Sequence, residues 1–359
     1  MIKYFTPFLI LISIFGHSQI NRHFLINEWI VTKTLMLDGS KDLTQPYLQS
    51  KFQRWRISSE KICMDSNPVE SNLKNCLDYH VMQNFIRTSS QSGYEIEKLT
   101  QDSLVLIQRI DGIVDADKIN RYWLTKSTVL KENYVDKHKN DSIIIAVEHF
   151  TPTFKQNLSK AIMDKFKNKS RFPNFKLIGN LVFYPVANKL EMEILNSGDK
   201  EVVSNKNNID LIKPIIEQTF SNWNLTDFQK FKKIYLPFVL DCFSTNDGSF
   251  YSKGSTIYYF ETNTDYFESF SGRGGDKFKS NENFENGVKA IQNKNLEKAL
   301  KYFLESYNLD LGKVDALYNI SNIYSYKGDK VNECKYLKKL RELGQTEGTK
   351  NYEMKCRED

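Results

Sequence analysis

The chain has 359 residues, too many for one ordinary domain and enough for two or three that each bury a core. Hydrophobic residues make up 40% of it and aromatic residues 13%, which excludes a mostly disordered chain. The net charge of +6 comes from 50 basic and 44 acidic residues mixed along the sequence, so no basic stripe marks a nucleic-acid-binding protein and we expect no nucleic-acid partner.

The amino terminus has the pattern of a cleaved signal peptide. Lys3 precedes an almost wholly apolar run, residues 4–15, and Gly16 and Ser18 are small residues at the positions that signal peptidase reads. As a helix this run is about 18 Å long, too short for a hydrocarbon core of about 30 Å. We therefore expect residues 1–18 to be removed, the mature protein to have no stable membrane span, and its location to be periplasmic or secreted.

The cysteines favour an oxidising compartment. Cys63 with Cys76 and Cys334 with Cys356 are pairs close in sequence, and each pair is predicted to form a disulfide. Cys242 follows an apolar run and is expected to be a small buried thiol. None of the five lies in a Cys-x-x-Cys pair or near a histidine at metal-ligand spacing, so we expect no metal and no other cofactor.

Residues 22–127 are predicted to form short strands separated by turns. Apolar residues alternate with polar ones over 55–62, and the segments 94–99 and 103–110 have the pattern of a hairpin. A last strand is predicted over 121–126. Short strands at roughly ten-residue spacing favour a small antiparallel β barrel or sandwich.

A resemblance supports the barrel. The order of Trp29, an Asp38-Gly39 turn, Tyr94-Glu95-Ile96 and the run 99–106 resembles the lipocalin-like domains of secreted Bacteroidetes proteins. The resemblance implies a barrel of about eight strands, whose interior either is filled by side chains or holds one small ligand.

Residues 150–243 have a mixed pattern. The spacing of apolar residues predicts a helix over 153–166, a hairpin of strands 177–183 and 190–195, a helix over 210–220 and a strand over 233–240. This α-β-β-α-β order therefore predicts a small α/β domain.

The same region resembles the carboxy-terminal domain of TonB through Gly179–Phe183, Asn188–Ile194, Asn222-Trp223 and Tyr235–Phe238. A TonB transducer needs an uncleaved anchor and a long proline-rich spacer, whereas this chain has a short leader and eight prolines, so we do not expect energy transduction. The resemblance implies instead an exposed sheet edge able to accept an extended peptide. The alternative is that this region only packs on its neighbours.

Residues 244–282 are interpreted as a connector, with a flexible break at Ser271–Asp276. The glycines of that break lack a following Gly-Lys-Ser/Thr and a preceding apolar strand, so they do not indicate a phosphate-binding loop. We therefore expect no nucleotide- or phosphate-binding site in this connector.

Residues 283–356 are predicted to be helical and repetitive. The apolar and small residues of a first hairpin recur about 34 residues later in a second one. The first set is Phe284, Gly287, Ala290, Ile291, Leu296, Ala299, Leu300, Phe303 and Tyr307, and the second is Leu317, Ser321, Tyr324, Val331, Cys334, Leu337 and Leu340. The pattern resembles two tetratricopeptide repeats, followed by a capping helix from about Glu347 that the Cys334–Cys356 bond would hold. A stack of only two repeats should need packing against the rest of the chain for stability.

The sequence contains no recognisable catalytic motif, because none of the five histidines has a carboxylate, serine or cysteine at a spacing typical of a catalytic site. We expect a non-enzymatic exported adaptor that binds an envelope protein or peptide through the repeat groove or a sheet edge. The alternative is a carrier of a small apolar ligand that uses the first domain. An interior filled by Trp29, Trp55 or Trp123 would favour the adaptor, and an apolar pocket would favour the carrier.

Overall fold

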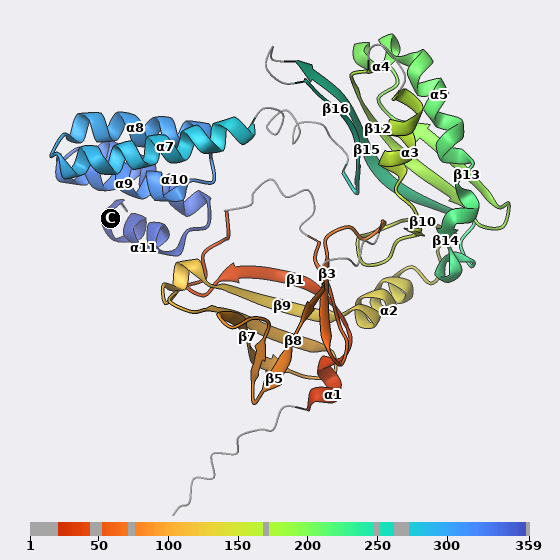
Figure 1. Cartoon of the computed structure of the whole chain (residues 1–359), viewed down its shortest axis with the longest axis horizontal. Coiled ribbons are helices and arrows are strands. Elements are labelled where there is room, and N and C mark those ends of the chain that lie inside the picture. Colours follow the sequence, from red (N-terminus) through yellow and green to blue (C-terminus); the bar gives the residue numbers. More distant parts are fainter. Residues whose placement is uncertain are drawn as a thin grey trace, which may run out of the picture.

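Figure 1 shows the computed structural model, which describes residues 21–43, 52–70, 76–167, 172–246, 251–261 and 273–356. The expected leader, residues 1–18, lies outside these ranges. Within them the chain is an α+β protein with three main hydrophobic cores. They lie in a barrel-like antiparallel sheet, in a middle region where helices cover a second sheet, and in a helical carboxy-terminal region.

The barrel-like sheet follows a short helix, α1 (Arg22–Leu25). Its described strands are β1 (Glu28–Met36), β2 (Arg54–Ile57), β3 (Lys61–Asp65), β4 (Cys76–Asp78), β5 (His80–Met82), β6 (Phe85–Arg87), β7 (Ser92–Leu99), β8 (Ser103–Ile110) and β9 (Asn120–Lys126). Neighbours pair antiparallel in the order β4-β3-β2-β1-β9-β8-β7-β6-β5. The predicted hairpin over 94–99 and 103–110 is therefore present as β7 and β8.

The two ends of this sheet are consecutive in the chain, because only Tyr79 separates β4 from β5. The segment 76–82 pairs with β3 through its first half and with β6 through its second half. This arrangement nearly closes the sheet on itself and removes most of its free edge. Of the two predicted architectures, the structure has the barrel-like one.

The segment 55–62, which was expected to be one strand, forms parts of two. Ser58 turns the chain: its N–H donates to the carbonyl of Lys61 at 2.9 Å, and its hydroxyl oxygen accepts the N–H of Lys61 at 3.0 Å. Ile57 and Ile62 consequently lie opposite each other across the turn. Alternation of apolar residues fits one strand and a tight hairpin equally well, which explains the error.

The middle region contains α2 (Ser127–Lys137), β10 (Ile143–Ile145), β11 (Thr153–Phe154), α3 (Leu158–Phe166), β12 (Phe175–Tyr184), β13 (Lys189–Ile194), α4 (Lys200–Ser204), α5 (Lys206–Glu217), β14 (Trp223–Asn224), β15 (Lys233–Asn246) and β16 (Tyr251–Tyr259). Its main sheet has the described order β10-β15-β12-β13, with β16 also paired to β15. The α-β-β-α-β order is present as α3, β12, β13, α5 and β15.

Helices α3 and α5 cover one face of this sheet (Figure 1). Leu158, Ile162 and Phe166 are four residues apart, so they share one face of α3 and are fully buried. On β15, alternate residues such as Leu236 and Leu240 point into the same core. The core thus lies between the helices and one side of the sheet.

Two predicted helices differ in their bounds. The first begins at Leu158 instead of residue 153, because Thr153–Phe154 pairs with Trp223–Asn224 as a strand and the Asn157 side chain accepts the N–H of Lys160 as a helix cap. The second, α5, ends at Glu217 with Pro214 inside it, instead of continuing to residue 220.

Part of the expected connector, residues 244–282, is regular structure. Strand β16 pairs along β15 from Phe238↔Tyr259 to Asn246↔Tyr251. Helix α7 already begins at Arg273, so the part of the expected flexible break from Arg273 to Asp276 is helical. A strand that pairs with its predecessor is stabilised by that neighbour, which composition alone does not reveal.

The helical region consists of α7 (Arg273–Gln292), α8 (Leu296–Leu309), α9 (Val314–Tyr326), α10 (Lys330–Glu342) and α11 (Thr346–Cys356). The two predicted hairpins are α7 with α8 and α9 with α10. Gly287 allows the first to close tightly, since a Cβ there would lie 2.7 Å from the Phe303 ring. Val331 was expected to line the core but is 81% exposed, because it lies two residues before the buried Glu333 and so on another side of α10.

Candidate functional site

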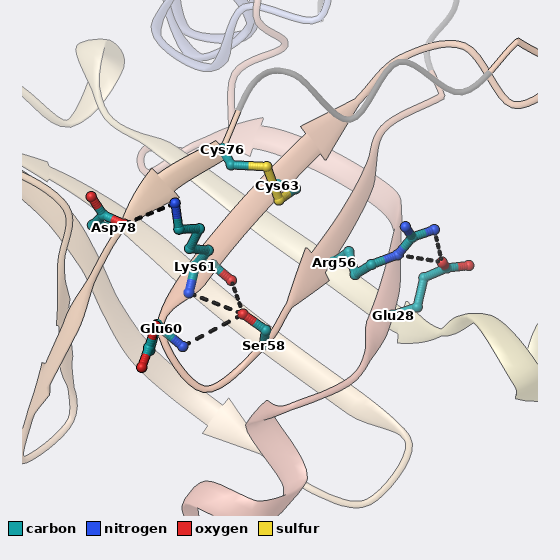
Figure 2. Close-up of a disulfide and its surroundings, with 8 residues drawn as sticks. All are labelled: Glu28, Arg56, Ser58, Glu60, Lys61, Cys63, Cys76 and Asp78. Atoms are coloured by element: carbon teal, nitrogen blue, oxygen red, sulfur yellow. Dashed lines mark hydrogen bonds and ion pairs between the residues drawn. A yellow bond between two sulfur atoms is a disulfide. The ribbon is translucent and has the colours of Figure 1, made fainter.

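Both cysteine pairs expected from the sequence are disulfide-bonded. Cys63 and Cys76 lie opposite each other on β3 and β4, with Cα atoms 3.9 Å apart (Figure 2). Cys334 of α10 is bonded to Cys356 of α11, with Cα atoms 5.5 Å apart. Cys242 is a buried free thiol, and burial raises its pKa. Disulfides persist in oxidising compartments, so these bonds fit an exported protein.

The Cys63–Cys76 bond closes the base of a loop that reaches the middle region. Val69, on this loop, is fully buried in the core of the middle region. Next to it, Glu70 Oε1 accepts the N–H of Leu158 at 3.2 Å and the hydroxyl of Tyr259 at 2.7 Å. The loop therefore fastens the barrel-like sheet to α3 and β16.

Side chains bond to backbone groups at both edges of the middle-region sheet, for which the sequence suggested an exposed peptide-binding edge. On one edge, the hydroxyl of Tyr134 on α2 donates to a carbonyl of β10, and Ser159 Oγ on α3 accepts the N–H of Ile257 on β16 at 3.1 Å. On the other edge, Met192 of β13 donates its N–H to Glu217 Oε1 at 3.0 Å. An added strand would have to break these bonds.

Large side chains lie in the interior of the barrel-like sheet. Trp29 and Trp55 are 0% and 2% exposed. The Trp55 ring packs against the rings of Tyr94 and Tyr122, at centroid distances of 5.0 and 5.4 Å. Burial raises the pKa of both tyrosines, so their phenols stay neutral. Trp123 is half-buried and does not belong to this core.

The helical region is joined to the barrel-like sheet at the turn between α10 and α11. Ser40 Oγ accepts the N–H of Thr346, the first residue of α11, at 2.9 Å. The N–H of Lys41 donates to the Gly344 carbonyl at 3.1 Å, and Gln345 Nε2 donates to the Lys41 carbonyl at 3.1 Å. The turn after β1 thus caps the last helix of the chain.

Helix α9 is close to the same part of the barrel-like sheet. Burial raises the pKa of Tyr318 on α9, and the nearby carboxylates of Asp38 and Asp117 raise it further. The Tyr318 hydroxyl also accepts the N–H of Gly348 on α11 at 3.1 Å. This side of α9 and α11 therefore faces the barrel-like sheet in part.

The outer face of the helical region, on α8 and α10, carries lysines and tyrosines, with two exposed glutamates, Glu305 and Glu342, three or four residues from the lysines. We define it by its exposed lysines and the tyrosines beside them: Lys298, Lys301, Lys335, Lys338, Lys339, Tyr302, Tyr307 and Tyr336. Lys339 Nζ lies 4.5 Å from the centroid of the buried Tyr307 ring, and Lys335 Nζ lies 5.5 Å from that of Tyr336. In the described part of the chain none of these lysines forms an ion pair.

This face was not predicted from the sequence. A signal was present, since Lys335, Lys338 and Lys339 are three and four residues apart and share one side of a helix. Tyr307 belongs to the preceding hairpin, and only the packing of α8 beside α10 brings its ring under Lys339.

Two of the described histidines have distinct surroundings. His138 Nδ1 contacts Asp141 at 2.7 Å in an exposed loop, and burial lowers the pKa of His149. Across the described ranges, no three His, Cys, Asp or Glu side chains are placed to hold a metal ion. None of the described helices has both the length and the apolar character needed to cross a membrane.

No protein-family model matches this chain, and neither does any curated protein or solved structure. The resemblances to lipocalin-like, TonB and tetratricopeptide domains therefore remain predictions from the sequence.

Proposed function

We propose that this chain is a non-enzymatic adaptor of the cell envelope, periplasmic or secreted, whose helical region binds an acidic segment of an envelope protein. The observation that carries the proposal is the outer face, where lysines of α8 and α10 lie over tyrosine rings without a carboxylate partner in the described residues. Such a surface offers both charge and apolar contact area to a negatively charged peptide.

The arrangement of charge on α10 favours an acidic partner. This helix has five basic and two acidic residues. Lys335 faces Lys338 and Lys339 at the spacings where like charges cost about 0.2–0.5 kcal/mol per pair. Lys339 lies in the last helical turn, where it offsets the helix dipole, but Lys335 and Lys338 have no such role. Glu342, four residues after Lys338, offsets part of this repulsion, and a bound carboxylate would relieve more of it.

The remaining features support a binding protein. Ala299, Ser306 and Ser321 are small buried residues, which fits closely packed helices, and both disulfides fit an oxidising compartment. The α-β-β-α-β order of the middle region is the one expected of a TonB carboxy-terminal domain, but side-chain bonds at its sheet edges favour a packing role over strand addition. Trp29 and Trp55 in the interior of the barrel-like sheet favour the adaptor over a carrier of a small apolar ligand.

The test is the titration of the chain with a fluorescently labelled octaglutamate peptide, followed by anisotropy. The double substitution Lys335→Glu with Lys338→Glu should weaken binding about tenfold, because two charge reversals remove about 1.4 kcal/mol or more of attraction. Binding of the unchanged protein should also weaken as salt is added, since these charges are exposed.

The matched control is Lys200→Glu with Lys206→Glu, which makes the same change of net charge at the first residues of α4 and α5. This control should bind like the unchanged chain. Equal loss in both double variants would show attraction by net charge alone and would contradict the proposal. Tighter binding of single-stranded DNA than of octaglutamate would also contradict it.

A further inference from the structure

A hollow of about 520 Å³ opens at one end of the middle region, between the β12–β13 turn, β14 and the chain at Lys155. Small-molecule sites usually have volumes of about 300–1,000 Å³. The floor is apolar and firmly held: Trp223 packs against the rings of Phe154 and Phe183, at centroid distances of 4.7 and 4.8 Å, and Phe220 is half-buried beside it. The hollow therefore has a defined base.

The rim of the hollow is polar and rich in hydrogen-bond donors. Its exposed side chains include Lys155, Asn188, Ser221, Asn224 and Gln229, and no Asp or Glu is among the described residues that line it. Lys155 forms no ion pair with a described carboxylate. Asn224 Oδ1 accepts the N–H and the hydroxyl of Thr226, at 3.1 and 2.7 Å, which leaves the Asn224 amide hydrogens for a ligand.

Backbone donors of the rim are already used within the fold. The N–H of Asn188 donates to the Pro185 carbonyl at 3.3 Å, and the N–H of Lys155 donates to the Asn222 carbonyl at 3.3 Å. A peptide carboxylate is usually captured by convergent backbone N–H groups, which this rim does not offer at these positions. Recognition must come from separated side-chain amides, a hydroxyl and one ammonium group.

We infer that this hollow binds an acidic saccharide. Separated amide and hydroxyl groups match the ring hydroxyls of a sugar, which both donate and accept hydrogen bonds. The half-buried Phe220 ring, which lines the hollow beside Trp223, offers an apolar surface to the C–H face of the sugar. Lys155 supplies the charge for a carboxylate. The inference uses only the middle region and does not depend on the helical region.

The test uses the full chain labelled with 5-fluorotryptophan and observed by fluorine NMR. The sequence has four tryptophans, so the spectrum should be simple, and Trp223→Phe assigns the resonance of interest. Addition of digalacturonate should shift the Trp223 resonance and leave those of Trp29 and Trp55 in place. Galactobiose, which carries hydroxymethyl groups instead of carboxylates, should bind at least tenfold more weakly.

The variant Lys155→Gln should weaken digalacturonate binding about tenfold and keep the residual binding of galactobiose. Its matched control is Lys160→Gln, an exposed lysine of α3 outside the hollow, which should change neither. A Trp223 resonance that digalacturonate does not move would overturn the inference. So would equal affinity in Lys155→Gln, or a larger shift with acetate or a tripeptide than with either sugar.

Discussion

Glu70 couples two parts of the fold directly, through its bonds to Leu158 and Tyr259. Burial raises the pKa of its carboxyl above the usual 4.5, although the bonds from the Tyr259 hydroxyl and the Leu158 N–H lower it in part. The folded protein therefore holds the Glu70 proton more tightly than the unfolded chain does. The stability that this group contributes is present at a pH below 4.5 and is lost as the pH rises through the raised pKa.

The substitution Glu70→Gln should flatten this dependence. The glutamine carbonyl can still accept both hydrogen bonds, while the cost of burying a charge disappears. We expect the variant to be at least as stable as the unchanged protein at about pH 7.5 and to lose less stability between about pH 5 and 7.5. Urea denaturation at both pH values measures this, with the exposed Glu60→Gln as control. A variant clearly less stable at the higher pH would contradict the account.

Residue roles could be predicted from the sequence where the partners are close along the chain. Cys63 and Cys76 are separated by 13 positions, and Cys334 and Cys356 by 22, so each pair could be proposed from spacing. Glu70 could not be singled out, because the groups that it contacts are 88 and 189 positions away. The rim of the hollow was missed for the same reason, since it joins Lys155 to residues after position 187.

At the scale of elements, α11 depends on its disulfide. Replacement of Cys334 and Cys356 by serine should cost about 3 kcal/mol of stability, because the bond closes a 22-residue stretch of chain. The effect should be local: amides of α11 should exchange with solvent much faster, while those of α7 and α8 change little. Hydrogen exchange read by mass spectrometry checks this.

The other disulfide provides the control for that experiment. Serine at Cys63 and Cys76 should leave the exchange of α11 unchanged and should speed exchange at Val69 and Glu70, on the loop that the bond closes. If α11 is equally protected with and without its own disulfide, packing alone holds this helix and the entropic argument is wrong.

Elements were predictable where their own pattern determines them. The hairpin of β7 and β8 joins neighbours in sequence across a short turn, so local rules suffice. Strands β10 and β16 were missed, because β10 pairs with residues 233–235, far along the chain, and β16 lies in a stretch whose polar composition indicates a connector. These segments are strands because of their pairing with β15, which no local pattern indicates.

At the scale of the whole molecule, the contact between the barrel-like sheet and α11 rests on few bonds. Ser40→Ala removes the side-chain oxygen that caps the N–H of Thr346, and loss of such a cap typically costs about 1 kcal/mol. We expect faster exchange at Thr346 and the amides that follow it, with β7 and β8 unchanged. Ser59→Ala, at an exposed serine in the turn between β2 and β3, is the control and should have no effect.

This arrangement of the parts could not be predicted from the sequence. Ser40 and Thr346 are 306 positions apart, and neither belongs to a pattern that indicates a partner. The sequence did predict that a short helical stack needs contacts with the rest of the chain for stability. The turn after β1 makes such a contact with the start of α11. That contact determines which face of the helical region stays accessible, so this face could not be predicted from the sequence either.

The central claim is that the outer face of the helical region is the binding surface, and photo-cross-linking tests it most directly. A photoreactive benzoylphenylalanine is placed at Lys301 on the outer face or at Asn322 on α9, and each protein is irradiated with labelled octaglutamate or octaglutamine. The account predicts a cross-link from position 301 to octaglutamate, little with octaglutamine, and little from position 322. Cross-linking mainly from position 322, or equally to both peptides, would contradict it.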